Sequence, residues 1–486
     1  MAGISRRKVI GGAAAGLLPA GGLGRAAQAQ DAAAASITAE VCVVGAGFAG
    51  LAAAYRLKQA GADVVVLEAR NRVGGRSLTI KTEDGAWIDL GAHWVGPTQD
   101  RFMAMIKEMG CETYRSPRLG KVLQLGIFDQ SKYQRIGAAD QDRDPGARLT
   151  NAEFDRLDRL AAKLDPEKPW SFPDAERLDA TTFSEWARQN IRNANARRFV
   201  TEEMCAIACA SPEELSILHM LFLIKACGGV EKLIGYDGDA QQDCVIGGTQ
   251  LVAQRLAEKL AGAIRHGAPV RRLEWSANGA VVHADTVSVA ARHVILAVPP
   301  HFAGAIEYAP ALPVDRVQVT QRWPQGLVIK VQIVYREPFW RRDGLSGESF
   351  DYESVLGETD DSSVPERYSG TGILTGFVYA AHARKLAPLP AEDRKQQLLA
   401  EVAKRFGRAA LDPIGYYEAN WSQEQWTRGC FTGFLTPGAT VLFRSAVRDP
   451  VGPLHFAGSE TATVWPSFID GAIRSGERAA AAVGKA

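Results

Sequence analysis

Two short apolar runs with a helical pattern between them open the main part of the chain. Glu40–Val44 and Asp63–Leu67 are apolar after their first residue, and Leu51–Gln59 carries apolar residues at helical spacing before Gly61. Short apolar runs of this kind are typical of strands buried in a parallel sheet. The pattern therefore predicts a strand–helix–strand unit of about 30 residues.

The rhythm of polar and apolar positions changes twice further along the chain. Between Lys121 and about Gln242, charge-rich amphipathic helices are expected, for example Asn151–Leu164 and Thr181–Gln189. An alternation of helix and strand returns at Val245 and ends in the apolar strand His293–Val298. A mainly helical insertion is therefore expected between two parts of a sheet-containing domain.

The last third of the chain mixes both patterns. Residues 311 to about 414 predict a strand at Leu327–Tyr335 and a helix at Ala391–Phe406. The tail predicts a Gly-rich loop, a strand at Pro453–Ala457 and a helix at about Phe468–Val483. Because no internal repeat is present, the alternation favours two interleaved domains over two consecutive ones.

Composition narrows the class of protein. The 486 residues are 46% hydrophobic and 23% charged, which excludes a wholly disordered or fibrous chain. The 56 basic and 55 acidic residues nearly balance, so binding to nucleic acid or to an anionic membrane is not expected. The seven cysteines form no CxxC pair, and neither a disulfide scaffold nor a metal site is expected.

The N-terminus carries the segments of an export signal in the usual order. The pair Arg6-Arg7 precedes a weakly hydrophobic stretch, Val9–Gly24, and Ala27–Ala29 has the small-x-small pattern of a cleavage site. Residues 1–29 resemble a bacterial twin-arginine signal, so cleavage before Gln30 and a periplasmic location are expected. The alternative is a tail rich in alanine and glycine without a targeting role.

Three glycines with GxGxxG spacing follow the first predicted strand, in Gly45-Ala46-Gly47-Phe48-Ala49-Gly50. In such a loop the first glycine permits a tight turn, the second lets the backbone approach a pyrophosphate, and the third lets helix and strand pack closely. Glu68-Ala69 ends the second strand, where an acid binds the ribose hydroxyls of an adenosine. The acid argues against a 2′-phosphate, so the unit predicts FAD or NAD rather than NADP.

A second glycine motif favours FAD. Arg70–Arg76 places two adjacent glycines between arginines directly after that acid, which allows close backbone approach and bidentate phosphate contact. It resembles the second flavin fingerprint of the FAD-dependent amine oxidase superfamily. Asp89–Gln99, which contains Gly91, Ala92 and His93, resembles that superfamily's next segment, where the backbone passes close to the flavin ring.

Three later segments narrow the resemblance to the flavin monoamine oxidase family. Trp421–Thr432 resembles the segment that packs against the flavin, and Gly458–Ala472 resembles the family's closing motif. Gln325–Lys330 is similar to the strand that bears the family's active-site lysine. The motifs follow the family's order over 38–486. The resemblance implies an α/β two-domain flavoprotein with a Rossmann-like FAD-binding domain and a mixed α+β substrate domain.

Both domains are expected to be discontinuous. The resemblance assigns residues 38–120, 245–310 and 415–486 to the FAD-binding domain, and residues 121–244 and 311–414 to the substrate-binding domain. Members of the family that anchor in membranes carry an apolar C-terminal tail. This sequence has none, so no membrane anchor is expected.

The resemblance also implies a set of cofactor-binding residues, drawn from the two glycine motifs, the ring-side segment and the C-terminal motifs. The set is Gly45, Ala46, Gly47, Phe48, Ala49, Gly50, Glu68, Ala69, Arg70, Arg76, Gly91, Ala92, His93, Val270, Trp421, Cys430, Gly458, Ser459, Glu460, Phe468 and Ile469. For His93, a hydrogen-bonded structural role is the alternative. The residue matching Cys430 can carry a thioether to the flavin, and an unlinked, buried cysteine is the alternative.

Lys330, Phe431 and Phe468 are the residues that the resemblance places at the reaction. Lys330 is expected to hold a water near flavin N5 and to assist reoxidation, and a solvated lysine on an edge strand is the alternative. Phe431 and Phe468 occupy the positions of two tyrosines that flank the amine in animal monoamine oxidases. An apolar pair would still favour the neutral amine, because desolvation disfavours the ammonium.

The expected reaction is flavin-dependent oxidation of a primary or secondary amine, of the aryl-alkyl kind, to an imine that hydrolyses to an aldehyde or ketone. Oxygen then reoxidises the FAD and yields hydrogen peroxide. The alternatives are an L-amino acid oxidase, a polyamine oxidase and a periplasmic dehydrogenase that passes electrons to a cytochrome. More remote are a flavin-dependent isomerase or desaturase of lipids and a flavin-binding protein without turnover. The sequence does not distinguish a monomer from a homodimer.

Overall fold

The computed structural model describes residues 35–83, 85–125, 133–136, 145–351 and 353–484. The expected signal, residues 1–29, lies outside these ranges. Within them, no helix is long and apolar enough to cross a membrane.

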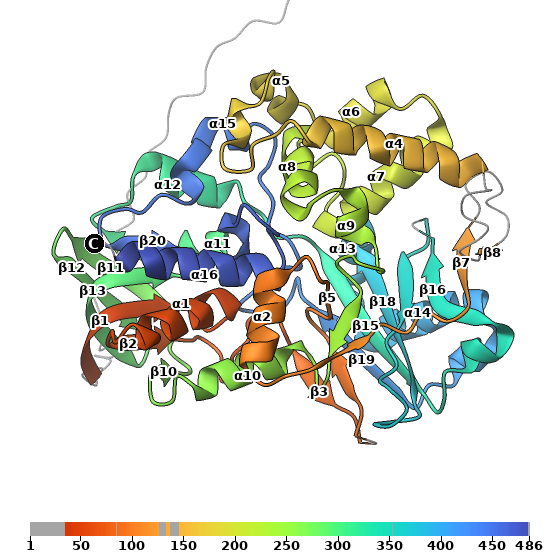
Figure 1. Ribbon diagram of the computed structural model, residues 1–486, viewed down its shortest axis with the longest axis horizontal. Coiled ribbons are helices and arrows are strands. Elements are labelled where there is room, and N and C mark those ends of the chain that lie inside the picture. The colour runs from red at the N-terminus through yellow and green to blue at the C-terminus, as the bar shows by residue number, and fades with distance from the viewer. Residues whose placement is uncertain (1–34, 84, 126–132, 137–144, 352, 485–486) are drawn as a thin grey trace, which may run out of the picture. The chain divides into compact units, whose positions relative to one another are not determined.

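An eight-stranded sheet carries the first glycine motif (Figure 1). Its strands lie in the order β10-β2-β1-β13-β12-β11-β14, and β20 also pairs with β13. Strands β10, β2, β1 and β13 are parallel, whereas β12 is antiparallel to both neighbours. The bounds are β1 Ala35–Val44, β2 Val64–Leu67, β10 Ile264–Arg265, β11 Val270–Ser276, β12 Gly279–Ala284, β13 Val287–Leu296, β14 Glu307–Ala309 and β20 Leu454–Phe456.

The expected strand–helix–strand unit is confirmed as β1, α1 and β2. Helix α1 covers Phe48–Gln59, and α16, Ile469–Val483, lies beside it (Figure 1). The two helices approach closely because Gly476 has no side chain, and a Cβ there would lie 2.0 Å from Ala49 O. Because α1 follows β1 after a short turn, its N-terminus lies at the carboxyl ends of the parallel strands. This is the usual ligand-binding edge of such sheets.

A second large sheet has seven strands, in the order β19-β15-β18-β17-β16-β7-β8. Strand β15 is buried along its whole length between β18 and β19. Lys330 of β15 therefore does not lie on an exposed edge. The bounds are β7 Lys121–Leu125, β8 Tyr133–Ile136, β15 Val328–Tyr335, β16 Leu345–Phe350, β17 Glu358–Asp361, β18 Gly372–Tyr379 and β19 Gly415–Asn420.

The remaining strands of the described residues form two small sheets. One pairs β3 with β4, and the other has the order β5-β9-β6. Their bounds are β3 Thr79–Lys81, β4 Trp87–Asp89, β5 Trp94–Val95, β6 Thr113–Arg115 and β9 Asp243–Val245.

Helices α4 to α9 form the helical insertion expected from the sequence, and they share a core that includes Phe183, Met204 and Leu218. The α-helices are α1 Phe48–Gln59, α2 Asp100–Glu108, α4 Pro145–Ala161, α5 Ala175–Ala180, α6 Phe183–Asn190, α7 Ala194–Ala208, α8 Ile217–Cys227, α9 Val230–Ile234, α10 Thr249–Glu258, α11 Pro300–Ala303, α12 Val314–Gln321, α13 Ala380–Leu386, α14 Ala391–Phe406, α15 Ala439–Phe443 and α16 Ile469–Val483. Short 3₁₀ helices are η1 Pro169–Ser171, η2 Phe339–Asp343, η3 Arg408–Leu411, η4 Arg444–Val447 and η5 Ser459–Thr461.

One segment differs from the pattern-based expectations. The helical stretch expected from Lys121 begins instead with strands β7 and β8. Strand β7 pairs with β16, a partner far along the chain that a local pattern does not reveal. Strand β19, which lies in the segment 415–486, pairs with β15 in the seven-stranded sheet.

Candidate active site

Residues of both large sheets line one cavity of about 450 Å³. Val44 of β1 and Leu67 of β2 contribute from the first sheet, and Lys330 of β15 and Phe377 of β18 contribute from the second. The cavity therefore extends from the glycine motifs to the buried strands of the seven-stranded sheet.

Most of the residues expected at the site line this cavity. They are Gly45, Gly47, Phe48, Ala49, Glu68, Ala69, Arg70, Arg76, Gly91, Ala92, His93, Val270, Lys330, Cys430, Phe431, Gly458, Ser459, Glu460, Phe468 and Ile469. Ala46, Gly50 and Trp421 are not among the lining residues. Ala46 and Gly50 contact the lining residues Glu68 and Gly45, whereas Trp421 donates to Leu90 O, next to the lining residue Gly91.

The glycine loop presents an open helix N-terminus to the cavity. Gly47 precedes α1, and no side chain caps the first N–H groups of this helix. A Cβ on Gly47 would meet only Gly75 Cα, at 4.0 Å, whereas a Cβ on Gly50 would lie 1.9 Å from Gly45 O. Free N–H groups beside two glycine backbones suit an anionic pyrophosphate. The cradle therefore fits FAD.

Glu68 joins the two glycine motifs. Its Oε2 accepts the Ala46 N–H at 2.7 Å, and its Oε1 accepts the Arg70 N–H at 2.8 Å. The Arg70 guanidinium turns to the C-terminal segment, where it donates to Glu424 Oε2 and Thr427 Oγ1, both at 2.5 Å. Arg70 thus fixes the loop around residue 424 against the first motif, a pairing that the sequence did not indicate.

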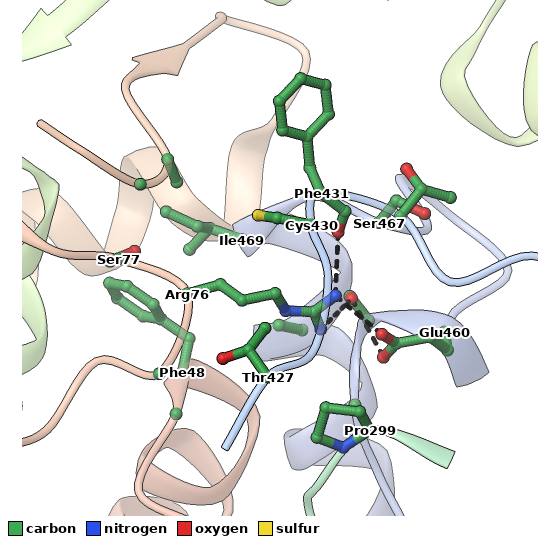
Figure 2. Close-up of a pocket in the computed structure, with 18 of the residues that line it drawn as sticks. Phe48, Arg76, Ser77, Pro299, Thr427, Cys430, Phe431, Glu460, Ser467 and Ile469 are labelled. Atoms are coloured by element: carbon green, nitrogen blue, oxygen red, sulfur yellow. Dashed lines mark hydrogen bonds and ion pairs between the residues drawn. The ribbon is translucent and has the colours of Figure 1, made fainter. Parts of the chain in front are cut away.

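Arg76 connects the second glycine motif to the C-terminal motifs. Figure 2 shows its guanidinium directed at Glu460 and at the Phe431 carbonyl. It lies 2.8 Å from Glu460 Oε1 and donates to Phe431 O at 2.9 Å and Ser459 Oγ at 3.0 Å. Burial alone would raise the pKa of Glu460, but the charge of Arg76 outweighs it and holds that pKa below its usual value.

Three consecutive carbonyls of the segment 89–91 accept side-chain hydrogen bonds. Gln332 Nε2 donates to Asp89 O at 3.1 Å, Trp421 Nε1 to Leu90 O at 2.8 Å, and Lys330 Nζ to Gly91 O at 2.9 Å. We call residues 89–91 with these three donors the carbonyl clamp. Trp421 therefore acts behind the cavity, holding in place the segment expected near the flavin ring.

Lys330 is the buried cation of this clamp. It is 2% exposed, and its Nζ lies 5.7 Å from the ring centre of Trp94 and 5.4 Å from that of Phe377. Burial lowers its pKa to about 8, although the charge of Asp89 acts in the opposite direction. An ammonium with this pKa is mostly charged at neutral pH and loses its charge in mildly alkaline solution.

His93 makes a hydrogen bond at one side of its ring, where its Nε2 lies 3.4 Å from Cys244 Sγ. Its Nδ1 lies 3.5 Å from Asp89 Oδ2 without forming a hydrogen bond. Burial lowers its pKa, so the imidazole is neutral at neutral pH. These contacts support the structural role of His93, although the residue lines the cavity.

Phe431 and two rings that the sequence did not single out form one aromatic wall. Phe377 stacks on Tyr379 with ring centres 5.6 Å apart, and Phe431 meets both edge-on at 5.9 and 6.4 Å. We call these three residues the aromatic wall. Phe468 lines the cavity from the start of α16, with its ring 5.0 Å from that of Trp465.

Cys430 lies next to the aromatic wall in the sequence and lines the cavity. It is 3% exposed, and burial raises the pKa of its thiol to about 12, while the charges of Arg76 and Lys330 act in the opposite direction. A thiol in this position is protonated at neutral pH. The two cations are the groups that would favour its thiolate.

Sequence reasoning missed several lining residues that come from the helical insertion and from β16 to β18. They are Glu203, Tyr236, Gln241, Phe350, Glu358, Phe377 and Tyr379. Each lies in a stretch without a motif, and the strand pairing brings β17 and β18 beside Lys330.

Comparisons with known proteins agree with this geometry. Residues 48–484 match the family model described as flavin containing amine oxidoreductase. The flavin-containing amine oxidase B of Sus scrofa is 34% identical over 446 residues, which are 91% of this chain and 85% of that protein. An L-amino acid dehydrogenase of Synechocystis sp. is 34% identical over 461 residues, 92% of this chain and 95% of that one. The structure of putrescine oxidase bound to putrescine has a TM-score of 0.87 at 35% identity, covering 93% of this chain and 100% of that one.

Proposed function

This chain belongs to the flavin-containing amine oxidase family, and on that premise we propose that it oxidises a small amine at the carbon bonded to nitrogen. The observation that carries the proposal is the make-up of the cavity. One part is a cradle for FAD around Gly47 and Arg76, and another part combines the aromatic wall with the carboxylates of Glu203 and Glu358. Aromatic faces and carboxylates are the groups that attract an amine.

FAD is the cofactor of this family, and the cradle fits it. When bound, FAD supplies the redox chemistry, taking a hydride from the substrate carbon and passing the electrons to oxygen to give hydrogen peroxide. The N-terminus of α1 at Gly47 would hold its pyrophosphate, and Glu68 its ribose. Gly91 and Ala92 would hold its ring end, kept in position by the carbonyl clamp.

The protein contributes orientation and a dry surrounding for the amine. The aromatic wall excludes water from one side of the cavity, and desolvation disfavours an ammonium relative to the neutral amine. A neutral amine releases a hydride from its neighbouring carbon more readily than a cation does. The imine product then hydrolyses in water to an aldehyde or ketone.

The charges around the cavity favour an amine over an amino acid. An amino acid needs a cationic partner for its carboxylate. Lys330 donates to Gly91 O, three of the four arginines that line the cavity pair with acids, and the fourth, Arg428, lies over the ring of Phe302. The three pairs are Arg70 with Glu424, Arg76 with Glu460 and Arg271 with Asp285. A substrate carboxylate near the aromatic wall would instead meet Glu203 and Glu358.

Oxygen uptake with a panel of amines and L-amino acids tests this proposal. The purified protein is expected to consume oxygen and release peroxide with at least one primary amine, and not with L-amino acids. Reduction of a dye without oxygen uptake would assign the electrons to another acceptor, such as a cytochrome. Turnover with amino acids alone would contradict the proposed function.

We propose that Cys430 binds FAD through a thioether. The support is its position among the cavity residues and the two cations that act on its thiol. Yellow flavin is expected to remain with the protein after acid precipitation, and Cys430→Ala is expected to release it. Complete release of flavin from the unmodified protein would contradict the link.

We propose that the first 29 residues direct the folded protein to the periplasm. The support is the order of the Arg6-Arg7 pair, the hydrophobic stretch and the cleavage pattern before Gln30. Arg6→Lys with Arg7→Lys is expected to keep the protein in the cytoplasm, as measured by fractionation, with Lys8→Arg as the control. Protein that reaches the periplasm despite both changes would contradict the twin-arginine route.

A further inference from the structure

Four acidic side chains from three elements gather beside the aromatic wall. They are Glu203 of α7, Glu348 of β16, and Glu358 and Asp360 of β17. Glu203 and Glu358 line the cavity, whereas Glu348 and Asp360 lie behind it and are 6% and 3% exposed. Their charges act on one another. We call these four residues the acidic cluster.

The register of the seven-stranded sheet sets the distance between the acidic cluster and Lys330. Lys330 lies opposite Phe377 on the next strand, and Phe377 lies opposite Glu358 on the strand after that. Residues directly opposite one another project from the same face of a sheet. Because neighbouring strands lie about 5 Å apart, the backbone of Glu358 is roughly 10 Å from that of Lys330. A distance of this size between Lys330 and Glu358 suits a substrate with an extended aliphatic carbon chain.

One buried carboxylate oxygen of the acidic cluster accepts no hydrogen bond. Tyr379 donates to Glu358 Oε2 at 2.7 Å, and Tyr236 donates to Asp360 Oδ1. Asp360 Oδ2 has no hydrogen-bond partner, although this side chain is buried. A buried carboxylate oxygen without a donor is costly, so the site is arranged to receive a donor or a cation.

The acidic cluster has four carboxyl groups but only two cations act on it among the described residues, and burial raises the pKa of Glu348 to about 8. Arg118 lies 2.5 Å from Glu348 Oε2, and the charge of Lys330 acts on Asp360. Burial and the charge of Asp360 raise the pKa of Glu358, because two adjacent carboxylates cannot both ionise cheaply without a counter-charge. A cation bound between them would remove this conflict.

We propose that the acidic cluster binds a second, distal ammonium group of the substrate, so that this chain prefers an aliphatic diamine or polyamine to an amine with an apolar tail. The proposal rests on the proposed amine oxidation and replaces the expectation of an aryl-alkyl substrate. The reacting nitrogen is neutral at the aromatic wall, while the distal nitrogen stays charged and donates to Glu358, with the carboxylate of Asp360 behind it. A metal ion is a poorer occupant, since within the described ranges no three His, Cys, Asp or Glu side chains are placed to hold one.

The substitution Glu358→Gln tests the proposal. It keeps the size of the side chain and an acceptor for Tyr379 but removes the negative charge. The kcat/KM for 1,4-diaminobutane is expected to fall about 100-fold, the worth of a hydrogen bond between charged groups in a buried site. The kcat/KM for 1-aminobutane is expected to change far less, because this substrate has no distal ammonium to contact Glu358. Retained oxidation of the monoamine also shows that the variant is folded.

Glu202→Gln is the matched control. Glu202 is the neighbour of Glu203 on α7, it is partly buried, and it does not line the cavity. This variant is expected to keep the wild-type ratio of diamine to monoamine activity.

Calorimetry with dithionite-reduced protein measures binding without turnover. The dissociation constant for 1,4-diaminobutane is expected to rise about 100-fold in Glu358→Gln. An unchanged activity ratio and unchanged binding in this variant would overturn the proposal, as would a wild-type preference for 1-aminobutane. If the wild type oxidised no amine, the proposed function would fail, while calorimetry would still report whether the acidic cluster binds the diamine.

Discussion

Replacing Arg76 by methionine is expected to leave the protein without bound FAD and to lower its free energy of unfolding by about 3–5 kcal/mol. Arg76 holds Glu460, the Phe431 carbonyl and Ser459 together within 3.0 Å. Glu460 is 6% exposed, so removal of its partner leaves a buried carboxylate uncompensated. Because whole proteins are stable by only about 5–15 kcal/mol, the change is large. Thermal unfolding and the ratio of flavin to protein absorbance measure both effects.

A second substitution separates the two roles of Arg76. Adding Glu460→Gln to Arg76→Met removes the orphaned charge, so most of the lost stability is expected to return. Flavin content is expected to stay low, because the arginine expected to contact the FAD phosphates is still missing. A single variant as stable as the wild type, or a double variant fully loaded with FAD, would contradict this assignment.

Replacing Lys330 by methionine is expected to slow reoxidation of the reduced protein by oxygen about 100-fold, while reduction by the amine changes far less. The ammonium lies buried at the cavity beside Trp94 and Phe377. In such a place its positive charge would stabilise the negative charge that develops on oxygen as it accepts electrons. Stopped-flow mixing of the reduced protein with oxygen measures the rate constant.

The pH dependence of reoxidation gives an independent test of Lys330. Its pKa of about 8 means that the charge is present below pH 8 and is lost as the pH rises through this value. The wild-type rate constant is therefore expected to fall above pH 8, and that of Lys330→Met to stay flat. Gln332→Met is the control, because it removes another donor of the carbonyl clamp without changing charge. The same pH profile in wild type and Lys330→Met would contradict the role.

Helices and strands whose ends are marked by glycine or proline could be predicted from the sequence. Helix α14 has the expected bounds, Ala391–Phe406, because Pro390 precedes it and Gly407 follows it, the residues that favour a helix start and a helix end. The glycine motif likewise predicted the strand and the turn, whereas α1 begins at Phe48, before the expected start at Leu51. In both places the chemistry and the backbone conformation are encoded within a few neighbouring residues.

The substrate end of the cavity could not be predicted in this way. Glu358 and Asp360 stand in a polar stretch that resembles a solvated loop, and their burial follows from pairing of β17 with β18 and of β18 with β15. Trp421 was expected beside the flavin, but it holds the Leu90 carbonyl from behind. These roles depend on contacts between residues distant in the sequence, which a local pattern does not contain.

Anaerobic reduction of the purified yellow protein tests the central claim most directly. The claim is that the cavity brings an amine, rather than an amino acid, to bound FAD. Mixing with a primary amine in the absence of oxygen is expected to bleach the visible band of the oxidised flavin within one turnover, while L-amino acids leave the band unchanged. Bleaching by L-amino acids but by no amine, in protein whose flavin dithionite still reduces, would contradict it.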